Sequence, residues 1–215
     1  MMKAGIFDLD GVIVNTVSFH FKAWQRMFNE YGKEFTFEDY KTKVDGIPRI
    51  DGARAILTDL SDEEIILAGD KKQAYFLEYL NKEEIPVYNT TVDIIKSLKK
   101  ENIKVGVISS SKNCLPILKR IKLDHLFEVI ITGNDITKGK PNPQAFYMAA
   151  EKMNADPKLC CVFEDAVLGV EAGKNAGMKC VGIDRYNKPE RLKKADIVVS
   201  DLGETTLNSI KALFE

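Results

Sequence analysis

Short apolar runs alternate with longer amphipathic segments over most of this chain. Strands are expected at residues 3–9, 104–109, 128–132, 159–164, 179–183 and 196–200. Their near-continuous apolarity is typical of strands that are buried on both faces, as in parallel sheets. Amphipathic segments lie between them, at roughly 91–101, 113–122, 142–153, 167–176 and 204–214. This alternation predicts βαβ units with right-handed crossovers, and therefore an α/β fold built on a doubly wound parallel sheet.

The stretch from residue 15 to residue 87 breaks this alternation because it contains no clear strand. FHFKAWQRMFNEYG (19–32) and SDEEIILAGDKKQAYFLEYLNKE (61–83) are patterned as long amphipathic helices. Ser61 is the expected N-cap of the second helix, and Glu64 stands at the capping-box position. We therefore predict a small helical cap domain at residues 15–87, inserted after the first strand of a Rossmann-like core formed by residues 1–14 and 88–215.

Polar residues follow the expected strands at the points where these end. In an open parallel sheet, ligands bind at the carboxyl ends of the strands. The residues at these ends are Asp8 and Asp10 after the first strand, Ser109 to Asn113 after the second, Lys140 in TKGKPNP beyond the third, and Glu164 and Asp165 after the fourth. Each segment alone is an ordinary turn or helix start, but their joint occurrence predicts one phosphate site at this edge.

The residue types at this edge indicate a particular chemistry. Four carboxylates without histidine or cysteine suit a hard cation held by oxygens, for which Mg²⁺ is the natural choice. If the strand continues past Asp8, the side chains of Asp8 and Asp10 share one face; if it ends there, they address different sides of a substrate. In the second case one is a nucleophile and the other a general acid/base. Ser109 with the amides of its loop would bind phosphate, and Lys140 would neutralise its charge.

Composition excludes several other classes of protein. The 31 basic and 32 acidic residues nearly balance, which argues against a nucleic-acid-binding protein. No apolar run is long enough for a membrane span. The N-terminus is not expected to be a signal peptide, because Asp8 and Asp10 interrupt its only apolar run. The four cysteines lack metal or redox spacing. We predict a cytoplasmic monomer with a small-molecule substrate.

Four segments in this order resemble the signature motifs of a known superfamily. FDLDGVIVNT, SSSKN, GKPNP and FEDAVLGVEAGKNAG are similar to the four motifs of the haloacid dehalogenase superfamily, and the helical insert resembles its first cap class. The likeness is nearest to β-phosphoglucomutases and related sugar-phosphate hydrolases. It covers nearly the whole chain.

The resemblance implies roles for individual residues. Asp8 would be the nucleophile that becomes phosphorylated, and Asp10 the general acid/base. Mg²⁺ would bind to the Asp8 carboxylate, the Asp10 main-chain carbonyl, Glu164 and Asp165. The implied phosphate and substrate ligands are Ser109, Ser110, Ser111, Lys112, Asn113 and Lys140. In the cap, His20 would position Asp10, and Lys71 would join that network.

The cap loop VDGIPRIDG (44–52) departs from the mutase pattern lysine-glycine-x-serine-arginine. It keeps Gly46 and Arg49, and Arg49 would bind the distal phosphate of a sugar bisphosphate. Asp45 stands in place of the lysine and Pro48 in place of the serine. An inward-pointing Asp45 would repel a second phosphate.

Three functions remain open on this reading. The leading hypothesis is a Mg²⁺-dependent phosphomutase that interconverts a β-hexose 1-phosphate and a hexose 6-phosphate through an aspartyl-phosphate. The alternative is a sugar- or polyol-phosphate phosphatase, in which water accepts the phosphoryl group. A non-enzymatic phospho-accepting switch is disfavoured, because such a receiver lacks a large helical insert.

Overall fold

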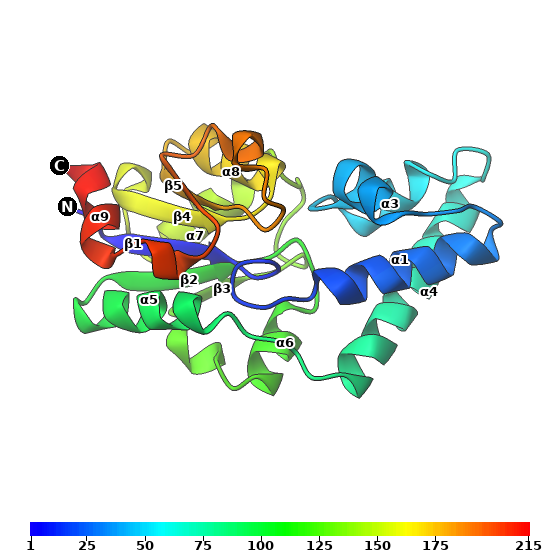
Figure 1. The fold of residues 1–215 in the computed structure, drawn as a ribbon, viewed down its shortest axis with the longest axis horizontal. Helices are drawn as coiled ribbons and strands as arrows, with labels where there is room; N and C mark the ends of the chain where they lie inside the picture. Colours follow the sequence, from blue (N-terminus) through cyan, green and yellow to red (C-terminus); the bar gives the residue numbers. More distant parts are fainter. The chain divides into compact units, whose positions relative to one another are not determined.

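The computed structural model describes all 215 residues, and its core is a six-stranded parallel sheet. The strands run in the order β3-β2-β1-β4-β5-β6, which places β1 and β4 at the centre (Figure 1). Their bounds are β1 Ala4–Asp8, β2 Lys104–Ile108, β3 Val129–Ile131, β4 Cys160–Glu164, β5 Lys179–Ile183 and β6 Ile197–Val199. All six expected strands are confirmed, and each is at most one residue shorter at either end than its sequence pattern predicts.

Helices cover both faces of this sheet, as the apolar strands require. The bounds are α5 Asn89–Lys100, α6 Cys114–Arg120, α7 Gln144–Lys152, α8 Val167–Asn175 and α9 Leu207–Lys211, with 3₁₀ turns at Asp124–Leu126, Pro157–Leu159, Pro189–Leu192, Leu202–Glu204 and Ala212–Phe214. Ala4 and Ile6 of β1 belong to the apolar cluster formed with α7 and α8. Gly5, on the opposite face of the strand, lies against Leu98 of α5.

The last expected helix, at 204–214, is interrupted in the structure. Thr206 has extended backbone angles, and its hydroxyl accepts a hydrogen bond from the Ser209 amide. This N-cap starts α9 at Leu207, so the residues before it form a separate 3₁₀ turn. The sequence pattern is therefore wrong about the start of this helix, because a local side-chain bond ended the periodic segment.

The inserted segment folds as a second compact unit, Asn15–Pro86, made only of helices. Its elements are α1 Val17–Glu30, α2 Phe37–Asp39, a π-helical turn Tyr40–Val44, α3 Arg49–Arg54 and α4 Asp62–Lys82. Trp24 and Phe28 of α1 stack on each other inside a buried apolar cluster that includes Ile65 of α4. Ser61 caps α4, and its capping box with Glu64 is formed as expected.

The other compact unit consists of Met1–Val14 and Val87–Glu215. Val87 belongs to this unit because it pairs with Val14 in an antiparallel bridge, and the Tyr88 amide donates to the Ile13 carbonyl. The second boundary therefore lies one residue before the one that the sequence predicts.

No helix in either unit has the length and apolarity needed to cross a bilayer. The four cysteines are free and buried.

Candidate active site

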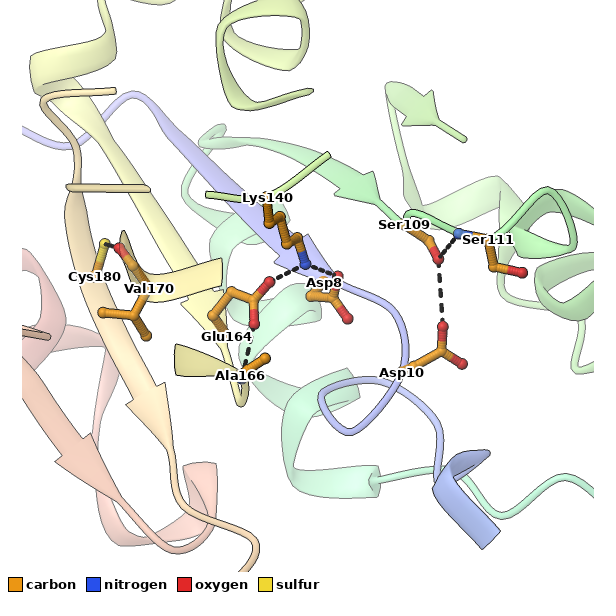
Figure 2. Close-up of polar contacts among 9 residues, drawn as sticks. All are labelled: Asp8, Asp10, Ser109, Ser111, Lys140, Glu164, Ala166, Val170 and Cys180. Carbon is orange, nitrogen blue, oxygen red and sulfur yellow. Dashed lines mark hydrogen bonds and ion pairs between the residues drawn. The ribbon is translucent and has the colours of Figure 1, made fainter. Parts of the chain in front are cut away.

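The two aspartates of the first motif have different hydrogen-bond partners in the structure. Asp8 is the last residue of β1 and is 5% exposed, while Asp10 lies in the following loop. The Lys140 ammonium donates to Asp8 Oδ1 at 2.6 Å, and the Ser109 hydroxyl donates to Asp10 Oδ2 at 3.3 Å (Figure 2). Of the two arrangements left open by the sequence, the structure therefore has the one in which the strand ends at Asp8 and the side chains diverge.

Lys140 lies between two acidic side chains from neighbouring strands. Its ammonium donates to Asp8 at the end of β1 and to Glu164 at the end of β4 (Figure 2). The Lys140 side chain is 7% exposed and that of Glu164 is fully buried. The second carboxylate oxygen of Glu164 accepts from the Ala166 amide at 3.0 Å. Both Glu164 oxygens thus have partners within the protein, and Glu164 fixes the ammonium beside Asp8.

The electrostatics of this cluster follow from its burial. Burial raises the pKa of Asp8 to about 8; the negative charges of Glu164 and Asp10 act in the same direction, and Lys140 opposes them. Burial by itself would lower the pKa of Lys140, but the adjacent Asp8 and Glu164 carboxylates outweigh it and raise that pKa. A single ammonium therefore does not fully compensate the buried acids.

Two glycines make room for the acids at the carboxyl end of β4. A Cβ atom on Gly11, whose φ is +82°, would lie 1.9 Å from Asp165 Oδ2. A Cβ atom on Gly169 would lie 2.0 Å from the Glu164 carboxyl carbon. Any larger residue would displace a carboxylate, because these separations are shorter than real Cβ atoms show. The motif glycines Gly11 and Gly169 therefore determine where Asp165 and Glu164 lie.

The four-acid magnesium cluster expected from the sequence is not assembled in this structure. No three histidine, cysteine, aspartate or glutamate side chains gather in an arrangement that could hold a metal ion. The reason is that Lys140 lies between Asp8 and Glu164, while Asp10 accepts from Ser109. In donor type and charge the site nevertheless fits a hard cation, since its acids are carboxylates in excess over one ammonium.

The loop after β2 folds back on itself beside Asp10. Ser109 is 4% exposed, and its hydroxyl also accepts from the Ser111 amide at 3.0 Å. The Ser111 hydroxyl in turn accepts from the Asn113 amide at 3.1 Å. The Ser110 side chain is half-buried and that of Lys112 is exposed. Ser109 is therefore the residue that links this loop to Asp10, and α6 begins after the loop, at Cys114.

In the cap unit, His20 has Lys72 as its partner, and not Lys71. The Lys72 ammonium lies 2.8 Å from His20 Nδ1, and the His20 ring stacks on Phe76. Lys72 is 4% exposed, whereas Lys71 is exposed and donates to Glu30 at 3.1 Å. Consecutive helical residues point about 100° apart, so only one of the two lysines faces the interior. The prediction for Lys71 was wrong by one residue.

The helical period carried a signal that could have identified Lys72. The buried residues of α4 are Ile65, Ala68, Gly69, Lys72, Phe76 and Leu80. Apart from the adjacent pair Ala68 and Gly69, these residues follow one another at a spacing of three or four, which marks one helix face. Position 72 falls on this face and position 71 falls outside it.

The remaining predicted ligands, Gly46 and Arg49, belong to the cap loop. Gly46 has φ +75°, a left-handed conformation that suits glycine. Arg49 is the first residue of α3, and its Nη2 donates to Asp70 Oδ1 at 2.9 Å. The Asp45 amide donates to the Tyr40 carbonyl, and the Asp45 side chain is half-buried. Arg49 thus has an acidic partner within the cap.

Comparison with known proteins decides the family. The family model described as haloacid dehalogenase-like hydrolase matches residues 5–183. The chain belongs to the haloacid dehalogenase-like hydrolases. Its relatives and structural neighbours place it in the β-phosphoglucomutase-like group, as the four motifs predict.

The relatives of this hydrolase family member include both mutases and phosphatases. A β-phosphoglucomutase of Bacillus subtilis is 32% identical over 224 residues, covering 100% of this chain and 96% of that protein. A phosphorylated carbohydrates phosphatase of Thermotoga maritima is 30% identical, covering 98% and 99%. The crystal structure of a β-phosphoglucomutase from Clostridium difficile superposes with a TM-score of 0.91 at 29% identity, covering 100% and 97%. The chain is therefore an enzyme of the phosphomutase or sugar-phosphate phosphatase kind.

Proposed function

We propose that this haloacid dehalogenase-like enzyme is a magnesium-dependent phosphomutase that interconverts a β-hexose 1-phosphate and a hexose 6-phosphate through a phosphoryl group carried on Asp8. The observation that carries the proposal is the buried Lys140 ammonium, held between Asp8 and Glu164 at adjacent strand ends. An ammonium in this position stabilises negative charge on a phosphoryl group that is transferred to Asp8. The β-phosphoglucomutase relatives, which match over nearly the whole chain, support the choice of sugar.

In the proposed first step, an oxygen of the Asp8 carboxylate attacks phosphorus and the bond from phosphorus to the sugar oxygen breaks. Asp10 donates a proton to that leaving oxygen, which would otherwise depart as an unstable alkoxide. Asp8 must be ionised to attack, and Lys140 favours the ionised form against the effect of burial. Ser109 donates to Asp10 Oδ2 and thereby helps to hold this side chain in place.

In the proposed second step, Asp10 takes a proton from the accepting hydroxyl, and that oxygen attacks the phosphorus on Asp8. The bond from phosphorus to Asp8 breaks, and the Asp8 carboxylate is released. In a mutase the acceptor is a hydroxyl of a sugar phosphate, so a sugar bisphosphate forms before Asp8 takes back the other phosphoryl group. We assign the second phosphate of this bisphosphate to Arg49, because a guanidinium binds phosphate bidentately. The assignment of His20 to Asp10 stays a prediction.

The proposal includes Mg²⁺, which enzymes of this family generally use. Asp8, Asp165 and the Asp10 carbonyl would hold the ion, with Glu164 as the further acid expected from the motif. When bound, the ion would supply positive charge at the phosphoryl oxygens in addition to that of Lys140. Titration calorimetry with Mg²⁺ tests this, since Asp165→Asn should weaken binding at least tenfold if Asp165 is a ligand.

A phosphatase is the second candidate, and specific observations in the cap favour it. Arg49 already pairs with Asp70, and Asp45 and Pro48 replace the lysine and serine of the mutase pattern. These features weaken the attraction of the cap for a second phosphate. Water would then be the acceptor in the second step, while Asp8 and Asp10 keep the same roles.

The experiment that separates the two candidates follows both products at once. The enzyme is incubated with β-glucose 1-phosphate, Mg²⁺ and a trace of the 1,6-bisphosphate, and hexose 6-phosphate and free phosphate are measured. A mutase gives the 6-phosphate with little free phosphate. Free phosphate without the 6-phosphate would reject the mutase and leave the phosphatase. Asp8→Asn is the control, and it should give neither product.

A further inference from the structure

Three consecutive main-chain carbonyls in the loop that carries Asp10 accept hydrogen bonds from distant parts of the core. Arg185 Nε donates to the Gly11 carbonyl at 2.8 Å. The Thr91 hydroxyl donates to the Val12 carbonyl at 2.7 Å. The Tyr88 amide donates to the Ile13 carbonyl at 2.9 Å. We call these three donors the carbonyl clamp. Two of them are side chains that the four sequence motifs do not contain.

The Arg185 guanidinium is fixed by several groups at once. Its plane packs over the Tyr88 ring, with the guanidinium carbon 3.7 Å from the ring centre. Its Nη1 donates to the Ser200 carbonyl at 3.1 Å and approaches the Asp201 carboxylate at 3.3 Å. The side chain is 13% exposed. These contacts leave Arg185 little freedom, so its bond to Gly11 holds the loop to a rigid support.

Thr91 provides the second side-chain donor from the first turn of α5. It is fully buried, and its hydroxyl bonds to the Val12 carbonyl, 79 residues away in the sequence. A helical threonine more often bonds back to a carbonyl of its own helix. The bond to Val12 therefore connects α5 to the loop that follows β1.

The clamp acts on the part of the loop that determines where two of the site acids lie. Gly11 follows Asp10 directly in the chain, and the position of its missing Cβ is filled by the Asp165 carboxylate. A shift of the Gly11 peptide would therefore move Asp10, the residue directly before it. Displacements of about 1 Å in catalytic groups can cost about a hundredfold in rate. The conformation of this loop should therefore affect the rate of catalysis.

We propose that Arg185 and Thr91 are positioning residues that hold Asp10 in the orientation needed to protonate the leaving oxygen. This inference rests on the proposed function, in which Asp10 is the general acid for departure of the sugar. Neither residue is assigned contact with the substrate. Their effect passes through the carbonyls of Gly11 and Val12.

The test compares two substrates that differ in their need for a proton. A sugar phosphate loses an alkoxide-like oxygen and depends on a general acid, whereas p-nitrophenyl phosphate loses a stable phenolate and depends on it little. The value of kcat/KM is measured for both, because it reports the step in which the phosphoryl group leaves the substrate. The ratio of the two values does not change if a variant merely lowers the fraction of folded enzyme.

Arg185→Ala should lower kcat/KM for the sugar phosphate by about 10- to 100-fold, and that for p-nitrophenyl phosphate by less than about threefold. Ethylguanidinium added to Arg185→Ala should restore part of the ratio. Arg191→Ala is the matched control: Arg191 is a half-buried arginine that packs over Tyr186, in the segment that follows β5. It should leave the ratio unchanged.

Thr91 provides an independent pair of variants if Arg185→Ala does not fold. Thr91→Val removes the hydroxyl and leaves the Val12 carbonyl without its donor, whereas Thr91→Ser keeps the donor. Thr91→Val should lower the substrate ratio by about tenfold, and Thr91→Ser should lower it by less than about twofold. Equal losses on both substrates for Arg185→Ala and Thr91→Val would overturn the inference.

Asp10→Asn separates a failure of this inference from a failure of the proposed function. Suppose that Asp10→Asn lowers kcat/KM selectively for the sugar phosphate while the clamp variants do not. In that case the clamp inference is overturned and the proposed function stands. If Asp10→Asn lowers kcat/KM equally for both substrates, Asp10 is not the general acid, and both proposals are overturned. A selective loss in Asp10→Asn, Arg185→Ala and Thr91→Val together supports both.

Discussion

The core and the cap loop hold their predicted site residues in different environments. In the core, Asp8 and Glu164 are buried at the ends of the adjacent strands β1 and β4, whose register fixes their separation, and the buried Lys140 ammonium lies between them. In the cap, Arg49 is paired with Asp70 at the surface, where the Asp70 side chain is 60% exposed. Buried charges in a rigid frame interact strongly, whereas exposed ion pairs contribute little and exchange partners readily.

This difference suggests a division of labour between the two regions. Chemistry requires groups held within a fraction of an ångström, and the core supplies these with strand ends and the carbonyl clamp. Choice among substrates requires side chains that can vary, and the cap loop carries Asp45 and Pro48 where the resemblance implies a lysine and a serine. Relatives that include mutases and phosphatases at similar identity are consistent with such a division.

Asp8→Asn should abolish turnover. The amide is a poor nucleophile, so no aspartyl-phosphate forms, and loss of a nucleophile typically costs about 10⁴-fold or more in kcat. Product formation under saturating substrate measures this. Unchanged turnover would show that Asp8 is not the nucleophile. It would also contradict the division in which the core performs the chemistry and the cap selects the substrate.

Lys140→Met should reduce kcat by about 10²- to 10³-fold, because a charge that stabilises the transferring phosphoryl group is lost. It should also destabilise the fold, since Asp8 and Glu164 lose the cation between them, and breaking a buried pair typically costs about 3–5 kcal/mol. Lys138→Met, two residues away and exposed, is the control and should change neither quantity. Steady-state kinetics and denaturant unfolding provide the two measurements.

Lys72→Met should affect the cap more than Lys71→Met does. Lys72 is buried against His20, Trp24 and Phe76, so its replacement should change the free energy of unfolding by about 1–3 kcal/mol. Lys71 is an exposed partner of Glu30, and its replacement should change that energy by less than about 0.5 kcal/mol. Equal effects from the two lysines would contradict the assignment of the inward face of α4.

The stability of the metal-free protein should depend on pH through Asp8. Burial raises the pKa of Asp8 from 3.8 to about 8, so the folded state favours the protonated form. The stability from this group is present below the ordinary pKa and is lost as pH rises through the raised one. Asp8→Asn removes this dependence, so it should gain stability over the wild type between about pH 5 and about pH 9.

Thermal unfolding at a series of pH values, in the presence of a chelator, measures this difference. The melting temperature of Asp8→Asn should rise relative to the wild type by a few degrees, because each kcal/mol corresponds to about 2–4 °C at this size. A constant difference across that pH range would show that Asp8 keeps an ordinary pKa in the fold.

Asp70→Asn should have the smallest effect, and it acts on specificity alone. Releasing Arg49 from its exposed ion pair should strengthen binding of a sugar bisphosphate by about two- to fivefold, with activity toward simple phosphate esters unchanged. Arg49→Ala should weaken bisphosphate binding. If Asp70→Asn and Arg49→Ala both leave the bisphosphate affinity unchanged, Arg49 does not bind the second phosphate.

The sequence alone determined the sheet, the helical insert and the residues at the strand ends. Apolar runs located all six strands, because strands in a parallel sheet are mostly buried on both faces and therefore nearly continuously apolar; the edge strand β6 is apolar although it is half-buried. Ser61 with Glu64 identified the start of α4, because a capping box is a local interaction. The carboxyl-end rule then selected Asp8, Asp10 and the residues of three other strand ends.

The contacts among these groups could be seen only once the chain was folded. That Lys140 lies between Asp8 and Glu164, that Lys72 and not Lys71 meets His20, and that Arg185 and Thr91 hold the carbonyls after Asp10 are all contacts between segments far apart in the chain. No local pattern encodes such contacts, because they depend on how separate elements pack. The sequence therefore determined what chemistry is available, and packing determined the orientation in which it is held.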